Sequence, residues 1–164
     1  MGGIRFGPDV AARPLIPSYV AARPSRDSLV AAHQRLTRDW WEFRGPQFDL
    51  YVSEPVLEEA AAGDSALATK RLELLANIRV LALTKGILKL AKSLVNEGPI
   101  PAKAAGDALH IAVATAYDCE YLLTWNCQHI ANAEIQRAAR IVAREHGFEL
   151  PVICTPEELM GDEE

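Results

Sequence analysis

The sequence is poor in cysteine, and the three cysteines that it has form no recognisable pattern. Cys119, Cys127 and Cys154 are too few and too irregularly spaced for a disulfide framework. Their odd number agrees with a reducing compartment, and we expect all three to be buried as small apolar side chains. A zinc site at Cys127 and His129 would need two further ligands at a recognisable spacing, and the sequence offers none.

Long uninterrupted apolar runs are also missing. The longest, residues 108–117, is interrupted by His110 and is far shorter than the roughly 20 residues that a membrane-spanning helix needs. Near the N-terminus, the Gly-Pro-Asp sequence at residues 7–9 interrupts any apolar segment of the kind found in secretory signals. We therefore expect a cytoplasmic protein with no membrane partner.

Positive charge is in deficit, because 17 Lys and Arg residues stand against 22 Asp and Glu residues, for a net charge of -5. This balance excludes a module that holds nucleic acid through a general excess of basic charge. A protein of this charge that acts on nucleic acid needs metal ions or local basic patches.

Hydrophobic residues make up 49% of the chain and charged residues 24%, which is typical of a folded protein. The length of 164 residues fits one domain over residues 1–164.

What the sequence does contain is an alternation of short apolar strands with helices, above all after residue 48. Predicted strands cover residues 48–52, 79–83, 121–124 and 151–154. Predicted helices cover residues 25–44, 53–63, 64–78, 84–97, 101–118 and 129–145, and a short helix begins at Thr155. We place the first N-cap at Ser25, and Pro101 at the first position of its helix. The alternation predicts an α/β fold: a parallel sheet covered by helices on both faces, with functional sites at the carboxyl ends of the strands.

Two polar residues lie in the most apolar predicted helix, within the sequence GDALHIAVATA (residues 106–116). Asp107 and His110 are three residues apart and therefore share one helix face. A carboxylate in such a helix needs a partner, because an isolated buried charge is costly. In the alternative interpretation, Asp107 interacts with the helix dipole in solvent and His110 is a core histidine with a structural role.

Two further stretches place polar side chains next to predicted strand ends. In SEPVLEEAAAGD (residues 53–64), Glu58 and Glu59 are adjacent on a helix and point about 100° apart, so only one of them can face a site. Both are equally compatible with a solvated helix surface. In YLLTWNCQHIANAEI (residues 121–135), an apolar strand leads to Thr124, Trp125 and Asn126, where open α/β sheets place ligand-facing groups.

Four ordered stretches together resemble a PIN-domain protein of the VapC toxin type: SEPVLEEAAAGD, IPAKAAGDALHIAVATA, YLLTWNCQHIANAEI and PVICTPEELMG. The resemblance extends over about residues 16–161. It implies a three-layer α/β/α domain with a central parallel sheet, whose strand ends gather acidic side chains around Mg²⁺ or Mn²⁺. It also implies metal-dependent cleavage of RNA, a small antitoxin protein as cognate partner, and a homodimer.

The resemblance also assigns a site, residue by residue. It places the family's second acid at Glu59 and its third at Asp107, which makes these two the predicted metal ligands. Asn126 falls where many relatives have a fourth acid, and its carbonyl oxygen would bind a metal-bound water. Hard divalent ions prefer carboxylate oxygens, and a bound ion polarises the phosphate and activates water for in-line attack. Three further residues are predicted to support the site: Thr124, His110 and Lys103.

The first acid of the family is missing from its expected position. Relatives have an apolar strand, an acid and two small residues before Ile-Pro-Ser-Tyr; here that tetrapeptide is present at residues 16–19, and Arg13 stands at the acid position. A cation there opposes metal binding. Asp9 lies four residues upstream, and at about 3.3 Å per residue an extended chain places it too far away to substitute.

The sequence VAARP around Arg13 occurs twice, at residues 10–14 and 20–24. Pro14 lacks the N–H that a central strand donates. We therefore predict an atypical N-terminus over residues 1–15, with a degraded or replaced first strand. The second copy leads into the helix predicted from Ser25.

Two functions of different classes follow from these observations. The first is a metal-dependent endoribonuclease of PIN type, the toxin of a toxin–antitoxin pair, with Glu59, Asp107 and Asn126 as its catalytic group. The second is a catalytically impaired PIN module that binds an antitoxin or a second copy of itself. Aromatic residues at the end of the first long helix suit such an interface, and suit core packing equally: Trp40, Trp41 and Phe43. A phosphatase or other small-molecule hydrolase has less support, since the sequence has no nucleophile motif and no phosphate-binding Gly-rich loop.

Overall fold

The central sheet of the protein has five parallel strands. The computed structural model describes residues 7–13, 15–126 and 132–161. Within them the strand order is β3-β2-β1-β4-β5. The strands are β1 (Asp9–Ala12), β2 (Asp49–Ser53), β3 (Arg79–Leu81), β4 (Tyr121–Leu123) and β5 (Val152–Cys154). The predicted α/β fold with a parallel sheet is therefore confirmed, and all of its predicted strands are present.

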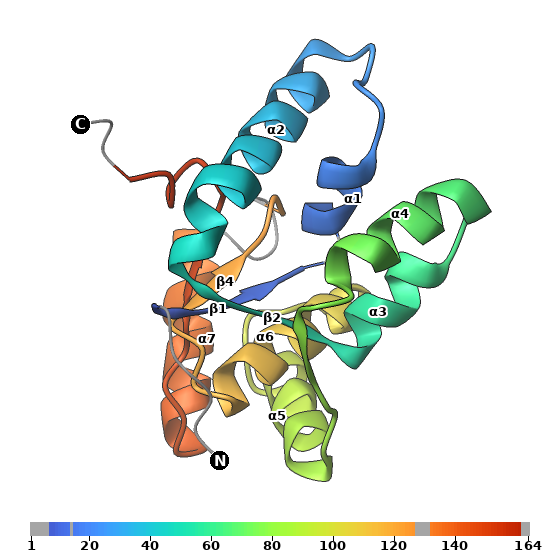
Figure 1. The fold of residues 1–164 in the computed structure, drawn as a ribbon. Helices are drawn as coiled ribbons and strands as arrows, with labels where there is room; N and C mark the ends of the chain where they lie inside the picture. Colours follow the sequence, from blue (N-terminus) through green and yellow to red (C-terminus); the bar gives the residue numbers. More distant parts are fainter. Residues whose placement is uncertain (1–6, 14, 127–131, 162–164) are drawn as a thin grey trace.

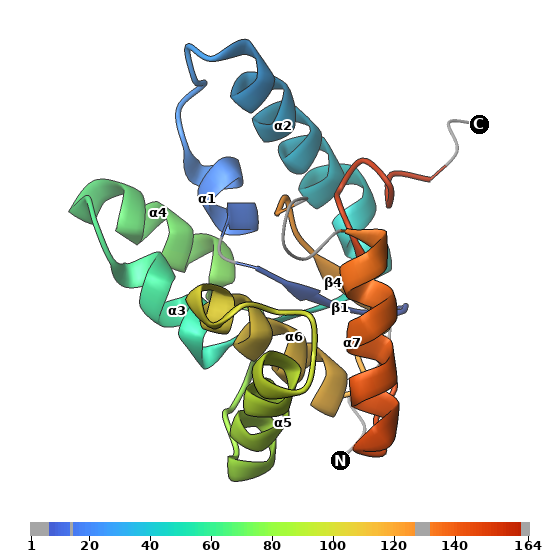
Figure 2. The ribbon, with the colours of Figure 1, turned by 180° about the vertical axis from the view of Figure 1, so that it is seen from behind.

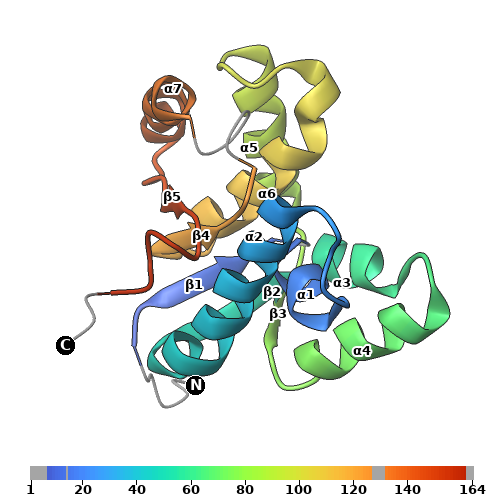
Figure 3. The same cartoon turned by 90° about the horizontal axis from the view of Figure 1, so that it is seen from above.

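Helices cover both faces of this sheet. The α-helices are α1 (Leu15–Ala21), α2 (Ser28–Asp39), α3 (Glu54–Ala61), α4 (Ser65–Leu75), α5 (Lys85–Asn96), α6 (Ala105–Ala116) and α7 (Ala133–Glu145). Figures 1 and 2 show α1 and α2 on one side of the sheet and α5, α6 and α7 on the other. Seen from above, α1 and α2 lie over the strands, with α7 beside β5 (Figure 3). This is the three-layer α/β/α arrangement.

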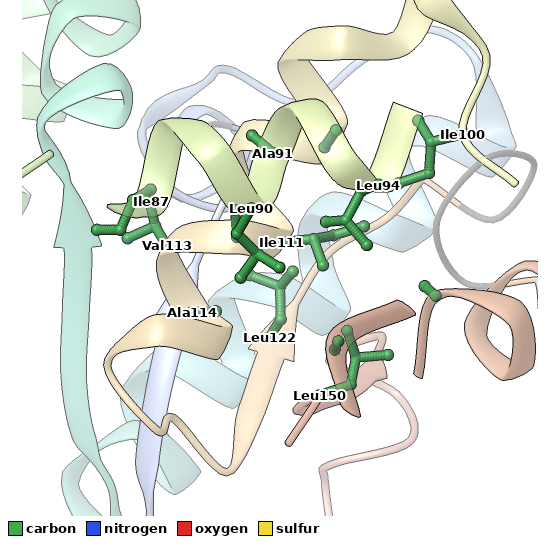
Figure 4. Packing of buried hydrophobic residues seen from close by; sticks show 14 of the residues in the cluster. Ile87, Leu90, Ala91, Leu94, Ile100, Ile111, Val113, Ala114, Leu122 and Leu150 are labelled. Atoms are coloured by element: carbon green, nitrogen blue, oxygen red, sulfur yellow. The ribbon is translucent and has the colours of Figure 1, made fainter. Parts of the chain in front are cut away.

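Alternate residues of the strands point into two separate cores, as the two-residue period of a strand requires. Ala11 and Leu122 face α5, α6 and α7, where they pack with Leu90, Leu94 and Ile111. Figure 4 shows how closely the side chains of α5 and α6 meet over Leu122. This cluster explains the broad apolar face predicted for residues 84–97.

The second core lies on the opposite face of the sheet. It contains Val10 and Val52 from the strands, with Val56 from α3. Trp40 is fully buried in it, and its indole N–H donates to the backbone carbonyl oxygen of Leu159 (3.1 Å). Among the aromatic residues considered for an interface, Trp40 is thus a core residue, whereas the side chain of Phe43 is 64% exposed.

The first strand is present, and it lies at the centre of the sheet. Residues Asp9–Ala12 form β1, which pairs with β2 on one side and β4 on the other. Ala12 is in register with Leu123, and the N–H of Arg13 donates to the carbonyl oxygen of Leu123 (3.1 Å). Position 14 lies outside the described residues. In the first VAARP sequence, residues 10–12 therefore belong to a central strand, and Arg13 follows it.

The first helix begins later than predicted. The N-cap of α2 is Asp27, whose carboxylate accepts a hydrogen bond from the N–H of Val30 (2.9 Å). Ser25 was the wrong choice, because its hydroxyl instead accepts from the N–H of Asp27 (3.1 Å). At its other end α2 continues into a π-helical turn, Trp40–Arg44.

The predictions for two other helix starts also need correction. Pro101 is not at the first position of an α-helix; it precedes a 3-10 turn, Ala102–Ala104, and α6 begins at Ala105. After β5, the predicted terminal helix is replaced by turns over residues 156–159. Thr155 and Glu158 do form the reciprocal side-chain-to-backbone hydrogen bonds of a capping box. Gly161, which follows these turns, has a positive φ of 80°, a backbone conformation that favours glycine.

The buried cysteines agree with the prediction where they are described. Cys119 and Cys154 are both buried, and burial raises the pKa of each thiol to about 12. Cys127 and His129, considered above as a zinc pair, lie outside the described residues. In the described part of the chain, no helix combines the length and the apolar character needed to cross a membrane.

Candidate functional site

The predicted site residues meet at the carboxyl edge of the sheet. Arg13 directly follows β1, Asn126 follows β4, Glu59 lies on α3, and Asp107 lies in the first turn of α6. We call these four residues the strand-end site. A pocket of about 510 Å³ opens beside them and is lined by Arg13, Leu15, Ser18, Glu59, Thr124, Trp125 and Asn126.

Two other hollows of comparable size contain none of the predicted site residues. One, of about 490 Å³, is lined in part by Asp49 and Arg79, the first residues of β2 and β3. The other, of about 760 Å³, is lined in part by Tyr121 and Val152, the first residues of β4 and β5. Both lie at the amino ends of strands. Functional sites of parallel sheets gather at the opposite edge, so the pocket beside Arg13 is the better candidate.

The shortest side-chain contact described in the strand-end site joins Arg13 to Asp107. Nη2 of Arg13 lies 2.7 Å from Oδ1 of Asp107, and the two side chains are only 12% and 17% exposed. The other carboxylate oxygen of Asp107 accepts a hydrogen bond from Nδ2 of Asn126 (3.3 Å). Both oxygens of Asp107 are therefore engaged, one of them in a charge-assisted hydrogen bond. The carboxylate expected to need a partner is partly buried, and that partner is an arginine.

The rest of the Arg13 guanidinium is poorly accommodated. Nε and Nη1 of Arg13 are buried and have no hydrogen-bond partner within the described ranges of the chain. The hydroxyl of Ser53, at the end of the neighbouring strand β2, is in the same condition. Natural proteins satisfy most buried polar groups, so three such atoms at adjacent strand ends mark an unusual place in the fold.

Glu59 contacts His110 rather than Asp107. Nε2 of His110 lies 3.4 Å from Oε1 of Glu59, whose side chain is 56% exposed. His110 is buried, and this burial lowers its pKa from an ordinary value of 6.5 to about 4; the positive charge of Arg13 acts in the same direction, and Asp107 opposes it. The imidazole is therefore neutral at pH 7, and its contact with Glu59 is not an ion pair at that pH.

The remaining predicted residues fall into two groups. Thr124 is buried in the pocket wall, and its hydroxyl accepts a hydrogen bond from the N–H of Asn126 (3.0 Å), so it helps to orient the loop that carries Asn126. Lys103 is exposed on the 3-10 turn before α6 and does not line the pocket. Glu58 is also exposed, which leaves Glu59 as the glutamate that faces the pocket.

One wall of the pocket was not foreseen. The indole of Trp125 stacks on the ring of His33 with 4.0 Å between ring centroids, and its N–H donates to the hydroxyl of Thr37 (2.7 Å). His33 and Thr37 belong to α2, which is distant in sequence from β4. Nothing in the local pattern around Trp125 identifies these partners, because they depend on how α2 lies across the sheet.

The donor set of the strand-end site does not fit a divalent metal ion. The described part of the chain has no group of three or more His, Cys, Asp or Glu side chains placed to hold one. Asp107 is already bound by the guanidinium of Arg13 and the amide of Asn126, and Arg13 brings a positive charge to the site. Divalent ions need several unengaged oxygen ligands and are repelled by a neighbouring cation.

Comparison with known proteins gives the family. The family model of the PIN domain matches residues 29–135, which is more than half of the chain. The chain belongs to the PIN domain family. The predicted relationship to PIN domains is therefore confirmed. PIN domains are in general nucleases that use divalent metal ions. The match includes Glu59, Asp107 and Asn126 of this PIN domain but begins after β1 and Arg13.

A solved structure shows the same fold. The chain is similar to one chain of the crystal structure of VapBC2 from Rickettsia felis bound to a DNA fragment from their promoter, with a TM-score of 0.50 and 13% identity. The similarity covers 90% of this PIN domain and 98% of the other chain. At this identity the comparison concerns the fold alone. No curated protein sequence matches the chain.

Proposed function

We propose that this PIN domain acts by binding a protein partner, an antitoxin of the toxin–antitoxin type, and that it does not cleave RNA through a bound metal ion. The observation that carries the proposal is the ion pair of Arg13 with Asp107 at 2.7 Å, in the place of the first acid. The proposed unit is a single domain over residues 1–164, since β1 and β5, on either side of the family match, belong to one sheet.

The side chains of the strand-end site support binding more than hydrolysis. A guanidinium is protonated at every physiological pH, so Arg13 can neutralise Asp107 but cannot take a proton from water. His110 is a neutral base, but it is buried and absent from the pocket lining. Glu59 is the exposed carboxylate of the pocket, beside the apolar side chain of Leu15, which is 41% exposed. A charged group next to exposed apolar surface suits a protein ligand.

The kind of partner is proposed from the family resemblance. The sequence resembles PIN-domain toxins, whose partners are small antitoxins, and the similar crystal structure is of VapBC2. Self-association into a homodimer is proposed on the same ground. Phe43 and Leu29, both more than 60% exposed along α2 and its terminal turn, are apolar side chains available to either interface.

A second candidate function is the endoribonuclease itself, with RNA as substrate and Mg²⁺ or Mn²⁺ as cofactor. What favours it is that Glu59, Asp107 and Asn126 are gathered at one strand edge, in the positions that the resemblance assigns to a metal-dependent catalytic group. What opposes it is the engagement of Asp107 by Arg13. The two candidates differ in whether RNA cleavage depends on divalent ions and on these residues.

A nuclease assay distinguishes the two candidates. Single-stranded RNA of mixed sequence is incubated with the purified protein and Mg²⁺ or Mn²⁺, alongside Glu59→Ala, Asp107→Ala and, as a matched control, the exposed neighbour Glu58→Ala. We expect all four proteins to show the same background. Cleavage that requires the metal, survives in Glu58→Ala and disappears in the other two variants would overturn the proposal. Co-expression with a candidate small antitoxin protein should yield a stable complex in size-exclusion chromatography.

A further inference from the structure

We infer that the guanidinium of Arg13 is a built-in cation that stands in the place of a metal ion, and that this one side chain keeps divalent ions out of an otherwise retained acidic site. The inference deepens the proposed function and rests on it in one respect: both treat the native chain as free of bound metal. Beyond the proposed function, it assigns to Arg13 the exclusion of divalent ions, and it holds that Glu59, Asp107 and Asn126 could still bind such an ion if position 13 carried a carboxylate.

Arg13 lies at the centre of the carboxyl edge of the sheet. It follows the central strand β1 and is tied to β4 through its N–H, so its side chain leaves the backbone in the middle of the sheet edge. Among the residues that line the pocket, it is the one with a positive charge. Its Nη2 binds Asp107 at 2.7 Å, which compensates the negative charge of this partly buried carboxylate. This compensation is the electrostatic part of what a metal ion does in an acidic cluster.

The guanidinium of Arg13 fits its surroundings poorly. A structural arginine site usually offers acceptors for most of the five N–H groups. Here Nε and Nη1 of Arg13 are buried without partners in the described part of the chain, and the buried Ser53 hydroxyl at the end of β2 has no partner there either. Among the described residues, the carboxylate of Asp107 is thus the one acceptor that the guanidinium finds. This is the pattern expected when a single position changes in a site whose other residues stay as they were.

The other residues of the strand-end site are still those of an acidic site. Glu59, Asp107 and Asn126 come from three separate elements and still converge at one edge: Asn126 hydrogen-bonds Asp107, and Glu59 meets His110 one helical turn after Asp107. A carboxylate at position 13 would remove one positive charge and add one negative charge. Three carboxylates and an amide oxygen form a ligand set that Mg²⁺ and Mn²⁺ prefer, and their mutual repulsion would favour a bound cation.

The test is to measure Mn²⁺ binding without using activity. Wild type, Asp107→Asn, Arg13→Asp, Arg13→Met and the double variant Arg13→Asp with Asp107→Asn are titrated with MnCl₂. Thermal unfolding gives the stabilisation, and the paramagnetic resonance signal of unbound Mn²⁺ counts the ions taken up. Arg13→Met is the matched control, because it removes the cation without adding an oxygen ligand.

We expect Arg13→Asp to take up Mn²⁺ and to gain about 5–10 °C in Tm at an ion concentration of about 100 times Kd. Wild type and Arg13→Met should show neither effect, and the double variant should lose both. Uptake by wild type that Asp107→Asn abolishes would overturn the inference. So would a folded Arg13→Asp protein that ignores Mn²⁺.

Folding itself serves as the readout if Arg13→Asp is unfolded without metal. Circular dichroism then follows refolding with and without Mn²⁺, and the neutral variant Arg13→Asn, which adds an amide oxygen, repeats the uptake measurement. Refolding that depends on Mn²⁺ supports the inference, and failure of both variants to respond overturns it. These outcomes are separate from the proposed function, which fails if wild type cleaves RNA and stands if wild type is inert while Arg13→Asp binds no metal.

Discussion

Arg13 and Asp107 show how little stability a well-formed ion pair can add. Their 2.7 Å contact is mostly buried, so both charges lose hydration when the protein folds. The attraction offsets that loss only where the other polar atoms find partners, and two buried nitrogens of Arg13 have none in the described part of the chain. Each unsatisfied group costs about 1–3 kcal/mol. The pair is therefore better explained by the charge balance of the strand-end site than by stability.

His110 makes the free energy of unfolding depend on pH, and the protein loses stability as the pH falls. Its pKa falls from 6.5 to about 4 because it is buried, and because Arg13 faces it; Asp107 acts against the shift. Since the unfolded chain binds the proton more readily, folding is disfavoured as pH falls from 6.5 toward 4 and is unaffected by this group above that window. The loss attributable to His110 between pH 7 and pH 5 is about 2 kcal/mol.

Urea unfolding at pH 7 and pH 5 measures this contribution. We expect His110→Gln to lose less stability than wild type over the same interval, because glutamine does not titrate. Glu59, the carboxylate that contacts His110, is present in both proteins. Equal losses in the two proteins would show that His110 does not carry the effect.

At the scale of elements, the strands and most helices could be predicted from the sequence because their signals are local. Apolar runs of strand length and helical periodicity located β2 to β5 and α5 within a few residues. The first strand was misjudged because Pro14 was taken as part of it, whereas β1 ends at Ala12. The terminal helix was misjudged because a capping box signals a start and says nothing about whether a helix continues.

Another contact at this scale joins α2 to the loop after β4. The Trp125 indole N–H donates to the buried hydroxyl of Thr37, which links the helix to the pocket wall. Thr37→Val keeps the shape but leaves the indole N–H without its acceptor. Thr115→Val is a matched control, since the buried Thr115 hydroxyl donates only to a carbonyl of its own helix, that of Ile111 (2.7 Å).

We expect Thr37→Val to lower the free energy of unfolding by about 1–3 kcal/mol more than Thr115→Val, because a buried donor is left unsatisfied. Chemical denaturation of both variants gives the comparison. The tryptophan fluorescence of native Thr37→Val should also differ from that of the wild type, because the environment of the Trp125 indole changes. Equal destabilisation by the two substitutions would mean that the Trp125 bond does not hold α2 in place.

At the scale of the whole molecule, the alternation of strands and helices predicted a parallel sheet with two covered faces, and this is the fold. The strand order and the assembly of the strand-end site depend on pairings between distant residues, which periodicity does not encode. The family resemblance supplied the positions of Glu59, Asp107 and Asn126. It did not supply the bond between Arg13 and Asp107, 94 residues apart, because the resemblance implies an acid at position 13, and two carboxylates do not form an ion pair.

The chain belongs to a family whose members are in general nucleases that use divalent metal ions. In this chain Arg13, at the carboxyl edge of the sheet, places a positive charge beside Asp107, and this charge opposes the binding of a metal ion. The direct measurement is isothermal titration of Mn²⁺ into the wild-type protein, with Asp107→Asn beside it. The account predicts no saturable heat in either protein up to millimolar Mn²⁺. Saturable binding by wild type that is lost in Asp107→Asn would contradict it, because Asp107 would then hold a metal ion despite Arg13.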